Sequence, residues 1–476
     1  MIRDNEIYTL LLQAVRKGVQ IVEEHEQQGR PIHKYSDFPE MAKFDSGLPR
    51  FSNLSYWSET SPKDYASIFT GELDAKKIAE WQPFIHLTKT HPTFINDIDT
   101  FTSYWKDTEI PYNFLETMNI VRMGLIIKDF INRYMHTAKS VGFDVDAFQE
   151  IYRQWEEFTF AERLEFDVVV PILFVNFSFD IFELTPYASI ERMDDNFQLA
   201  RNTKFLHMVA ANEIVTGAAT HALVLNNWSV KNGPHPIGHS SLYYLETFTP
   251  IVPVIDRFFA ALRATAAVQT GYGQILVRPV DWAARWDAHL PYVIMVFVRA
   301  YPDEFENFGW LKTPPILSEE DCQKVSTVYN SLADSSANQL LVASRRLNAA
   351  YLRRSEEDSI LDITIALEAL LVKDGRTGEI THKLATRLAV VCKMEPFETY
   401  TPAEVFAHCK KIYDFRSAVA HGTHEIDKKR YLDDKQKNVK VPTVEFALAL
   451  LRHCLTFFCL HNEFLDSQKL DMLLLE

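Results

Sequence analysis

The last third of the chain is dominated by signals that begin and end helices. Ser318 and Ser355 each precede an acidic residue three positions later, which is the pattern of an N-terminal helix cap. Thr401 adds a proline at the first helical position and Glu404 at the third. Together with apolar residues at helical spacing, these signals predict a bundle of helices joined by short links. The predicted helices are residues 319–352, 356–373, 379–393, 402–421 and 443–464.

The preceding two thirds differ in the spacing of their apolar residues. Residues 5–28, 113–140 and 144–164 have helical spacing, whereas residues 30–112 are irregular and rich in aromatic residues and prolines. From residue 165 on, β-branched and aromatic runs favour strands. The predicted strands are Phe166–Val170, Ile172–Phe177, Phe179–Leu184, Ala222–Val230 and Gln274–Val280, and Phe258–Ala267 is predicted to be helical.

These patterns predict an α+β multidomain protein. We expect a mostly helical N-terminal region over residues 1–164 and a mixed α+β domain over 165–312, with a sensing or regulatory role. The helical bundle follows over residues 318–466, and Thr313-Pro314-Pro315 forms a stiff connector before it. The length of 476 residues agrees with more than one core, because single cores usually stop growing near ~250–300 residues.

The composition narrows the classes of function. The formal net charge of -15 argues against a protein that coats nucleic acid in general, so any RNA contact must use a local basic patch. The five cysteines form no C-x-x-C pair, which predicts reduced, mostly buried thiols. We see neither a signal peptide nor an uninterrupted run of ~18 apolar residues, so we expect a soluble, cytoplasmic protein without a membrane partner.

The residues that carry chemistry lie where the fourth predicted helix of the bundle ends, between Lys411 and Gly422. Metal-independent cleavage of RNA needs a base for the 2′-hydroxyl, an acid for the leaving 5′-oxygen and a cation for the phosphorane. His421 can act as base or acid near neutral pH. Arg416 offers a permanently charged fork to phosphate oxygens. Gly422 suits the left-handed conformation that ends many helices.

The spacing of these two residues sets a geometric condition. Residues five apart on a regular helix differ by about 140° around its axis, at ~3.6 residues per turn. Arg416 and His421 therefore cannot both face one phosphate from one regular helix. Either the helix is distorted at its end, or a second copy supplies the missing group across a two-fold axis.

The segment Asp358–Ala369 together with Tyr413–Gly422 resembles the HEPN superfamily, and most of all its ApeA-like branch. That branch carries an aliphatic-Ala-Leu-Glu-Ala-Leu helix and a Tyr-x-x-Arg-Ser/Asn-x-x-x-His-Gly helix end, which Arg416, Ser417 and His421 match. The resemblance covers about the last 150 residues of the chain. It implies a helical bundle, homodimerisation and endoribonuclease activity in anti-phage defence or toxin-type growth arrest, with tRNA among the candidate substrates. One departure is Ser417, where many active members have Asn, Asp or His.

Other residues are expected to support this site. Glu368 lies in an apolar helix and is expected to pair with a cation, with Arg416 as one candidate. Tyr413 and Asp414 belong to the same motif. The loop 423–442 is net basic and could hold RNA phosphates. We expect His424 in the same loop to be a loop residue rather than a second catalytic base. The basic residues of the loop are Lys428, Lys429, Arg430, Lys435, Lys437 and Lys440.

Simpler interpretations stay open. Arg416 could pair with Asp414 or Glu368, His421 could be a helix-end histidine favoured by the helix dipole, and the basic loop could be merely solvated. The bundle could also be a non-catalytic adaptor that binds RNA or a nucleotide, or only dimerises. We predict no cofactor and no metal, and a phage-derived or other protein trigger acting on residues 1–312. Two further candidates are weak. A metal site at His235 and His239 is disfavoured because prolines exclude a helix there, and nucleotide binding at Gly271-Tyr272-Gly273 is disfavoured because the third glycine of the motif is absent.

Overall fold

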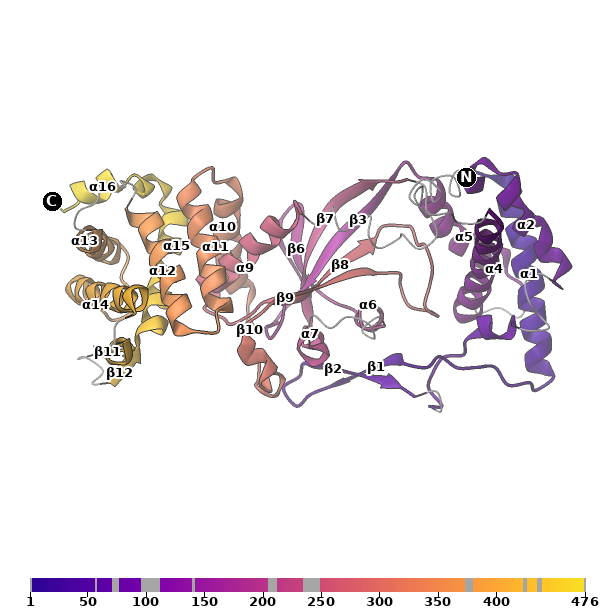
Figure 1. Ribbon diagram of the computed structural model, residues 1–476, viewed down its shortest axis with the longest axis horizontal. Helices are drawn as coiled ribbons and strands as arrows, with labels where there is room; N and C mark the ends of the chain where they lie inside the picture. The colour runs from indigo at the N-terminus through magenta and orange to yellow at the C-terminus, as the bar shows by residue number, and fades with distance from the viewer. Residues whose placement is uncertain are drawn as a thin grey trace.

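The computed structural model describes residues 2–55, 58–70, 77–95, 112–138, 142–203, 212–233, 249–372, 380–422, 426–434 and 439–474. The protein has an α+β fold in several parts, as the sequence predicts. Helices near the N-terminus lie at one end of the molecule, an antiparallel sheet lies in the middle, and the C-terminal helices lie at the other end (Figure 1).

The N-terminal helices form a core of their own. Helix α1 (Asn5–Gln27) buries an apolar face that includes Leu11 and Val15 against α4 (Tyr112–Thr137) and α5 (Val145–Phe160). A Cβ on Gly18 would lie 2.1 Å from Cδ1 of Ile131, so this glycine permits the close approach of α1 and α4. All three long helices agree with the sequence prediction.

The described residues between 30 and 95 are less irregular than predicted. Strands β1 (Phe38–Lys43) and β2 (Pro49–Leu54) form an antiparallel hairpin, and short helices follow at η1 (Tyr65–Ile68), η4 (Ala79–Trp81), α2 (Gln82–His86) and η5 (Leu87–Lys89). The hairpin was missed because only a few of its side chains are buried, which weakens the alternation of apolar and polar residues that identifies a strand.

A six-stranded antiparallel sheet forms the middle of the molecule, in the order β5-β6-β7-β3-β8-β9. Central strand β3 sends Val168 and Val170 to one face and Val169 to the other, as pleating requires. The prediction of a strand over 172–177 was wrong except for its last two residues, because Asn176–Phe177 forms the short strand β4, which pairs with β10 (Ile316–Leu317). The strands of the sheet are β3 (Arg163–Pro171), β5 (Ile181–Thr185), β6 (Ala188–Arg192), β7 (His221–Lys231), β8 (Tyr272–Pro279) and β9 (Ile294–Ala300).

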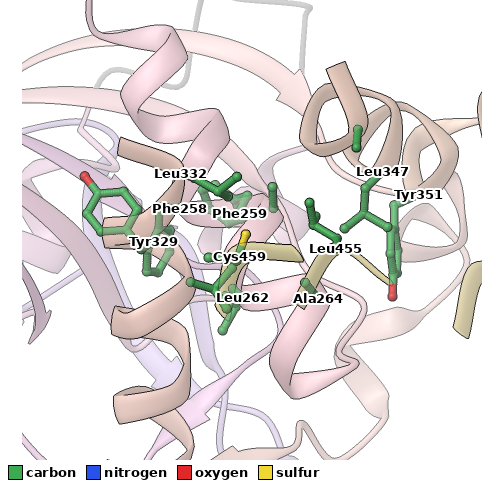
Figure 2. Packing of buried hydrophobic residues seen from close by; sticks show 14 of the residues in the cluster. Phe258, Phe259, Leu262, Ala264, Tyr329, Leu332, Leu347, Tyr351, Leu455 and Cys459 are labelled. Carbon is green, nitrogen blue, oxygen red and sulfur yellow. The ribbon is translucent and has the colours of Figure 1, made fainter. Parts of the chain in front are cut away.

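Helices cover both faces of this sheet. One face packs with β1, α6 (Asp195–Ala200) and α7 (Glu213–Gly217). The other face packs on α9 (Val252–Ala266), which in turn contacts the C-terminal helices. Figure 2 shows Phe258 and Leu262 of α9 among side chains from the bundle, including Tyr329 and Leu455. One continuous apolar core therefore runs from the sheet into the bundle, across the connector at residues 313–315.

The C-terminal bundle begins and ends its helices largely where the sequence predicts. Ser318 and Thr401 form capping boxes, Ser355 caps its helix, and Gly422 has a left-handed φ of 62°. One prediction was wrong: residues 319–352 form two helices rather than one, because residues 335–337 are extended between them. The loop after residue 422 also contains a short hairpin. The elements are α10 (Glu319–Asp334), α11 (Asn338–Leu352), α12 (Glu356–Leu371), α13 (Ile380–Met394), α14 (Pro402–His421), η9 (Ile426–Lys429), β11 (Tyr431–Asp434), β12 (Val439–Pro442), α15 (Thr443–Leu460), η10 (Asn462–Leu465) and α16 (Ser467–Met472).

Helix α15 is the most apolar helix of the bundle. It is long and apolar enough to cross a membrane by length and composition, with a mean hydropathy of 1.5, and 56% of it is buried inside the fold. Glu445 and Arg452 interrupt its apolar sequence. A buried core helix passes the same test, so this finding alone does not assign α15 to a membrane. The five cysteines are free and buried, as predicted.

Candidate active site

Helix α14 holds the motif in a regular geometry. Thr401 and Glu404 satisfy the first backbone groups of the helix, and the Gly422 N–H donates to the carbonyl oxygens of Ala418 and Val419 at its end. The α-helix continues through His421. The offset of about 140° between Arg416 and His421 is thus preserved, and the alternative of a distorted helix end does not apply.

Arg416 is half-buried, and its environment is unusual for a cation. Its Nε is buried and has no hydrogen-bond partner. In the part of the chain that the structure describes, neither Asp414 nor Glu368 forms an ion pair with it. A buried donor without a partner costs ~1–3 kcal/mol, so such groups are rare unless a ligand satisfies them. The simpler interpretation of Arg416 as an ion-paired structural arginine therefore has no support from its contacts.

Glu368 pairs with a tyrosine rather than with a cation. The buried Tyr413 hydroxyl donates to Oε1 of Glu368 over 2.9 Å, linking α14 to α12. Burial raises the pKa of Tyr413, the Glu368 carboxylate raises it further, and the positive charge of Arg416 acts in the opposite direction. Tyr413 therefore stays protonated at neutral pH, and its link to Glu368 fixes the face of α14 that carries Arg416 one turn later.

The other two motif residues are open to solvent. Ser417 and His421 are both exposed, and so is Asp414. Among the described residues, nothing hydrogen-bonds to the His421 ring, so its tautomer is not fixed within one chain. The structure thus gathers Tyr413, Glu368 and Arg416, while His421 stands apart at the end of the helix.

The basic residues after the motif are less available than the sequence suggests. Arg430 forms ion pairs with Glu356 and Glu357 in the first turn of α12, and with Asp427 at 3.1 Å. The Nζ of Lys429 donates to the carbonyl oxygen of Asp414 over 3.3 Å. These contacts dock η9 onto α12 and α14. Lys428 and Lys440 are exposed, whereas His424, Lys435 and Lys437 lie outside the described residues.

Sequence reasoning missed these ion pairs, and it missed a second set in the same bundle. Asp362 on α12 is 2% exposed and accepts hydrogen bonds from Arg346 at 2.6 Å and Arg353 at 2.7 Å. The signal in the sequence was the presence of acidic residues on α12. Arg430 comes from more than 70 residues away, whereas Arg346 and Arg353 lie 16 and 9 residues before Asp362.

Beside the Tyr413–Glu368 pair, α12 carries apolar side chains that the chain itself does not fully cover. Leu361 and Ile365 lie seven and three residues before Glu368, so they share its helical face, and both are only half-buried. A partly exposed apolar face on the same side of α12 as Glu368 suits contact with another protein surface.

The weaker candidates gain no support. His235 and His239 lie outside the described residues. Gly271 and Gly273 serve packing, because a Cβ there would lie 2.2 Å from the carbonyl oxygen of Ala300 and 2.4 Å from Cγ2 of Thr216. Among the described residues, no three His, Cys, Asp or Glu side chains gather as metal ligands would.

Comparison with known proteins adds no relative. We find no match to a protein-family model, to a curated protein or to a solved structure.

Proposed function

We propose that the protein is a metal-independent endoribonuclease whose active site is built around Arg416 and His421. The observation that carries this proposal is the half-buried Arg416 guanidinium, whose Nε lacks a partner. An RNA phosphate supplies what this group lacks: an anion with several acceptor oxygens in a geometry that a guanidinium can contact with two hydrogen bonds.

In the proposed reaction, His421 takes the proton from a ribose 2′-hydroxyl. The 2′-oxygen attacks the adjacent phosphorus, Arg416 stabilises the added charge on the phosphorane, and the bond to the 5′-oxygen breaks as that oxygen accepts a proton from water. The products are a 2′,3′-cyclic phosphate and a free 5′-hydroxyl. Ser417 lies beside Arg416 in sequence and could contact the same phosphate.

We further propose that the active form is a two-fold dimer in the cytoplasm. The offset of about 140° on a regular α14 supports this, because a second copy can bring its histidine to the first copy's arginine. The half-buried Leu361 and Ile365 next to Glu368 offer apolar area for such an interface. Residues 1–312 would then restrain the nuclease until a phage-derived or other protein trigger is bound.

One observation favours a second candidate function, a non-catalytic adaptor that binds RNA through Arg416. The His421 ring has no hydrogen bond among the described residues, whereas catalytic histidines are commonly oriented by a partner. In the dimeric nuclease that partner comes from the second copy, and in the adaptor it is absent.

Cleavage of a labelled RNA by wild-type protein, Arg416→Ala and His421→Ala separates the two functions. The nuclease predicts losses of ~10²–10⁴ in rate for His421→Ala, undiminished wild-type cleavage in EDTA, and a 2′,3′-cyclic phosphate end. The adaptor predicts RNA binding that depends on Arg416 and no cleavage by any protein. Cleavage by His421→Ala at the wild-type rate would contradict the assignment of His421.

A further inference from the structure

A cavity of about 510 Å³ lies where the middle part of the protein meets the bundle, away from Arg416. Its walls come from the end of α9, from α10, from α15 and from the segment 395–398 that follows α13. A volume of this size falls in the range of cavities that hold small molecules, and such sites often lie between parts of a protein. The activity proposed above does not use it.

One wall of the cavity is apolar. Phe397 is 4% exposed and packs against the ring of His453 at a centroid distance of 5.3 Å. Val328 of α10 and Ala449 of α15 add aliphatic surface, and Leu460 lies at the rim. Burial lowers the pKa of His453, so this ring is neutral at pH 7 and extends the apolar surface.

The same cavity presents opposite charges that do not neutralise each other. Arg452 is half-buried, and its Nη1 donates to the hydroxyl of Tyr351 over 3.0 Å. Glu395 lines the cavity near His453, which contacts its carbonyl oxygen. Among the described residues, Arg452 and Glu395 form no ion pair with each other, although both face the cavity. A half-buried charge usually has a partner of opposite charge, whereas Arg452 has only the neutral Tyr351 hydroxyl and Glu395 has no ion pair among the described residues. A ligand that carries both signs of charge would supply both.

We propose that this cavity binds a free α-amino acid with a large apolar side chain. Its carboxylate would meet the guanidinium of Arg452, its ammonium would meet the carboxylate of Glu395, and its side chain would lie on Val328, Ala449 and Phe397. Because α9 belongs to the middle part and α10 and α15 to the bundle, the ligand would contact both and stabilise their association. This site is independent of Arg416 and His421, so it does not depend on the nuclease proposal.

Calorimetric titration of the full chain with L-phenylalanine tests the site. Phenylalaninamide lacks the carboxylate and N-acetyl-phenylalanine lacks the ammonium, so each loses one charge-assisted contact and should bind at least ~10-fold more weakly. Glycyl-phenylalanine separates its charges by a peptide unit and distinguishes a free amino acid from a peptide end. If the dipeptide binds more tightly than phenylalanine, the free amino acid is the wrong ligand.

Variants then locate the binding. Arg452→Met and Glu395→Gln should each weaken phenylalanine binding at least ~10-fold, and Ala449→Trp should block it by filling the cavity. Glu463→Gln, an exposed carboxylate on η10 outside the cavity, is the control and should bind as wild type does. If Ala449→Trp does not fold, the two charge variants still decide the question. The proposal is overturned if wild type shows no binding at ~5 mM phenylalanine, or if phenylalanine, phenylalaninamide and N-acetyl-phenylalanine bind alike.

Discussion

Replacement of Arg416 by methionine should stabilise the fold while it abolishes cleavage. Methionine keeps the unbranched apolar stem of arginine and removes the charged group. The buried Nε of Arg416 has no partner, and an unsatisfied buried donor costs ~1–3 kcal/mol. Nε is the one buried nitrogen of this half-buried side chain that lacks a partner, so we expect a gain of about 1 kcal/mol, at the low end of that range.

The matched control is Arg353→Met in the same bundle. Arg353 is also partly exposed, but its Nε donates to the buried Asp362 carboxylate at 2.7 Å. Its loss removes one of two arginines from a carboxylate that is 2% exposed, so we expect a destabilisation of about 2 kcal/mol, within the range for hydrogen bonds to charged groups. The two arginine-to-methionine changes thus have opposite predicted signs.

Thermal unfolding of the full chain, followed by calorimetry, measures both effects. A change of ~1 kcal/mol corresponds to about 2–4 °C in Tm for a unit of 150–250 residues. Inorganic phosphate should raise the Tm of wild type and leave that of Arg416→Met unchanged, because an anion that binds only the folded state stabilises it. If Arg416→Met lowers Tm as Arg353→Met does, then Arg416 is a structural residue and the argument from its missing partner fails.

Three further predictions concern the dimer, the half-buried Asp129 on α4 and the basic loop. A mixture of Arg416→Ala and His421→Ala protomers should recover cleavage that neither variant has alone, since one shared site then keeps both groups. The shared site would be ruled out if the mixture does not cleave RNA and the wild type, shown by light scattering to be a monomer, is fully active. Burial raises the pKa of Asp129 to about 7, so the stability of the wild type should fall as pH rises from about 4 to 7. Asp129→Asn should remove that fall and be more stable than the wild type by ~1–2 kcal/mol at pH 8, as measured by urea unfolding. Equal stability curves for the two proteins would contradict this prediction. In the His421→Ala background, Lys428→Ser should weaken RNA binding and reduce the slope of log affinity against log salt by about one unit. Identical salt slopes would mean that Lys428 does not contact RNA. Arg430→Ser should instead lower Tm, because it breaks the ion pairs to α12.

The helix that carries the candidate site could be predicted to the residue because all its boundary signals are local. Thr401, Pro402 and Glu404 begin α14, and Gly422 ends it, within one or two turns of the groups that they satisfy. The break at residues 335–337 was missed because it contains neither glycine nor proline. The Ala337 N–H donates to the Ser335 hydroxyl over 3.0 Å, a local bond through which a serine competes with the helix, and this was a weak signal that the sequence contained.

The surroundings of the site could not be predicted, because they depend on residues far apart in the chain. The sequence shows that Glu368 lies in an apolar helix and needs a partner, but not that Tyr413 rather than Arg416 supplies it. The basic loop likewise looks free until the fold brings Arg430 to Glu356 and Glu357, 74 and 73 residues earlier. Counting charges along a sequence therefore overstates the cations that remain for a ligand.

The same pairing explains how an acidic chain could still act on RNA. Other arginines of the described bundle have protein partners: Arg346 and Arg353 bind Asp362, Arg387 binds Asp471, Arg430 binds the start of α12, and Arg452 binds Tyr351. Among those described residues, Arg416 is the half-buried arginine left without one. Because the other arginines already have protein partners, the bundle would attract nucleic acid only weakly in general. RNA binding would then depend on a phosphate that reaches the guanidinium of Arg416. A nuclease built in this way would owe its specificity to access to Arg416, and in the proposed dimer the second copy of the chain would control that access.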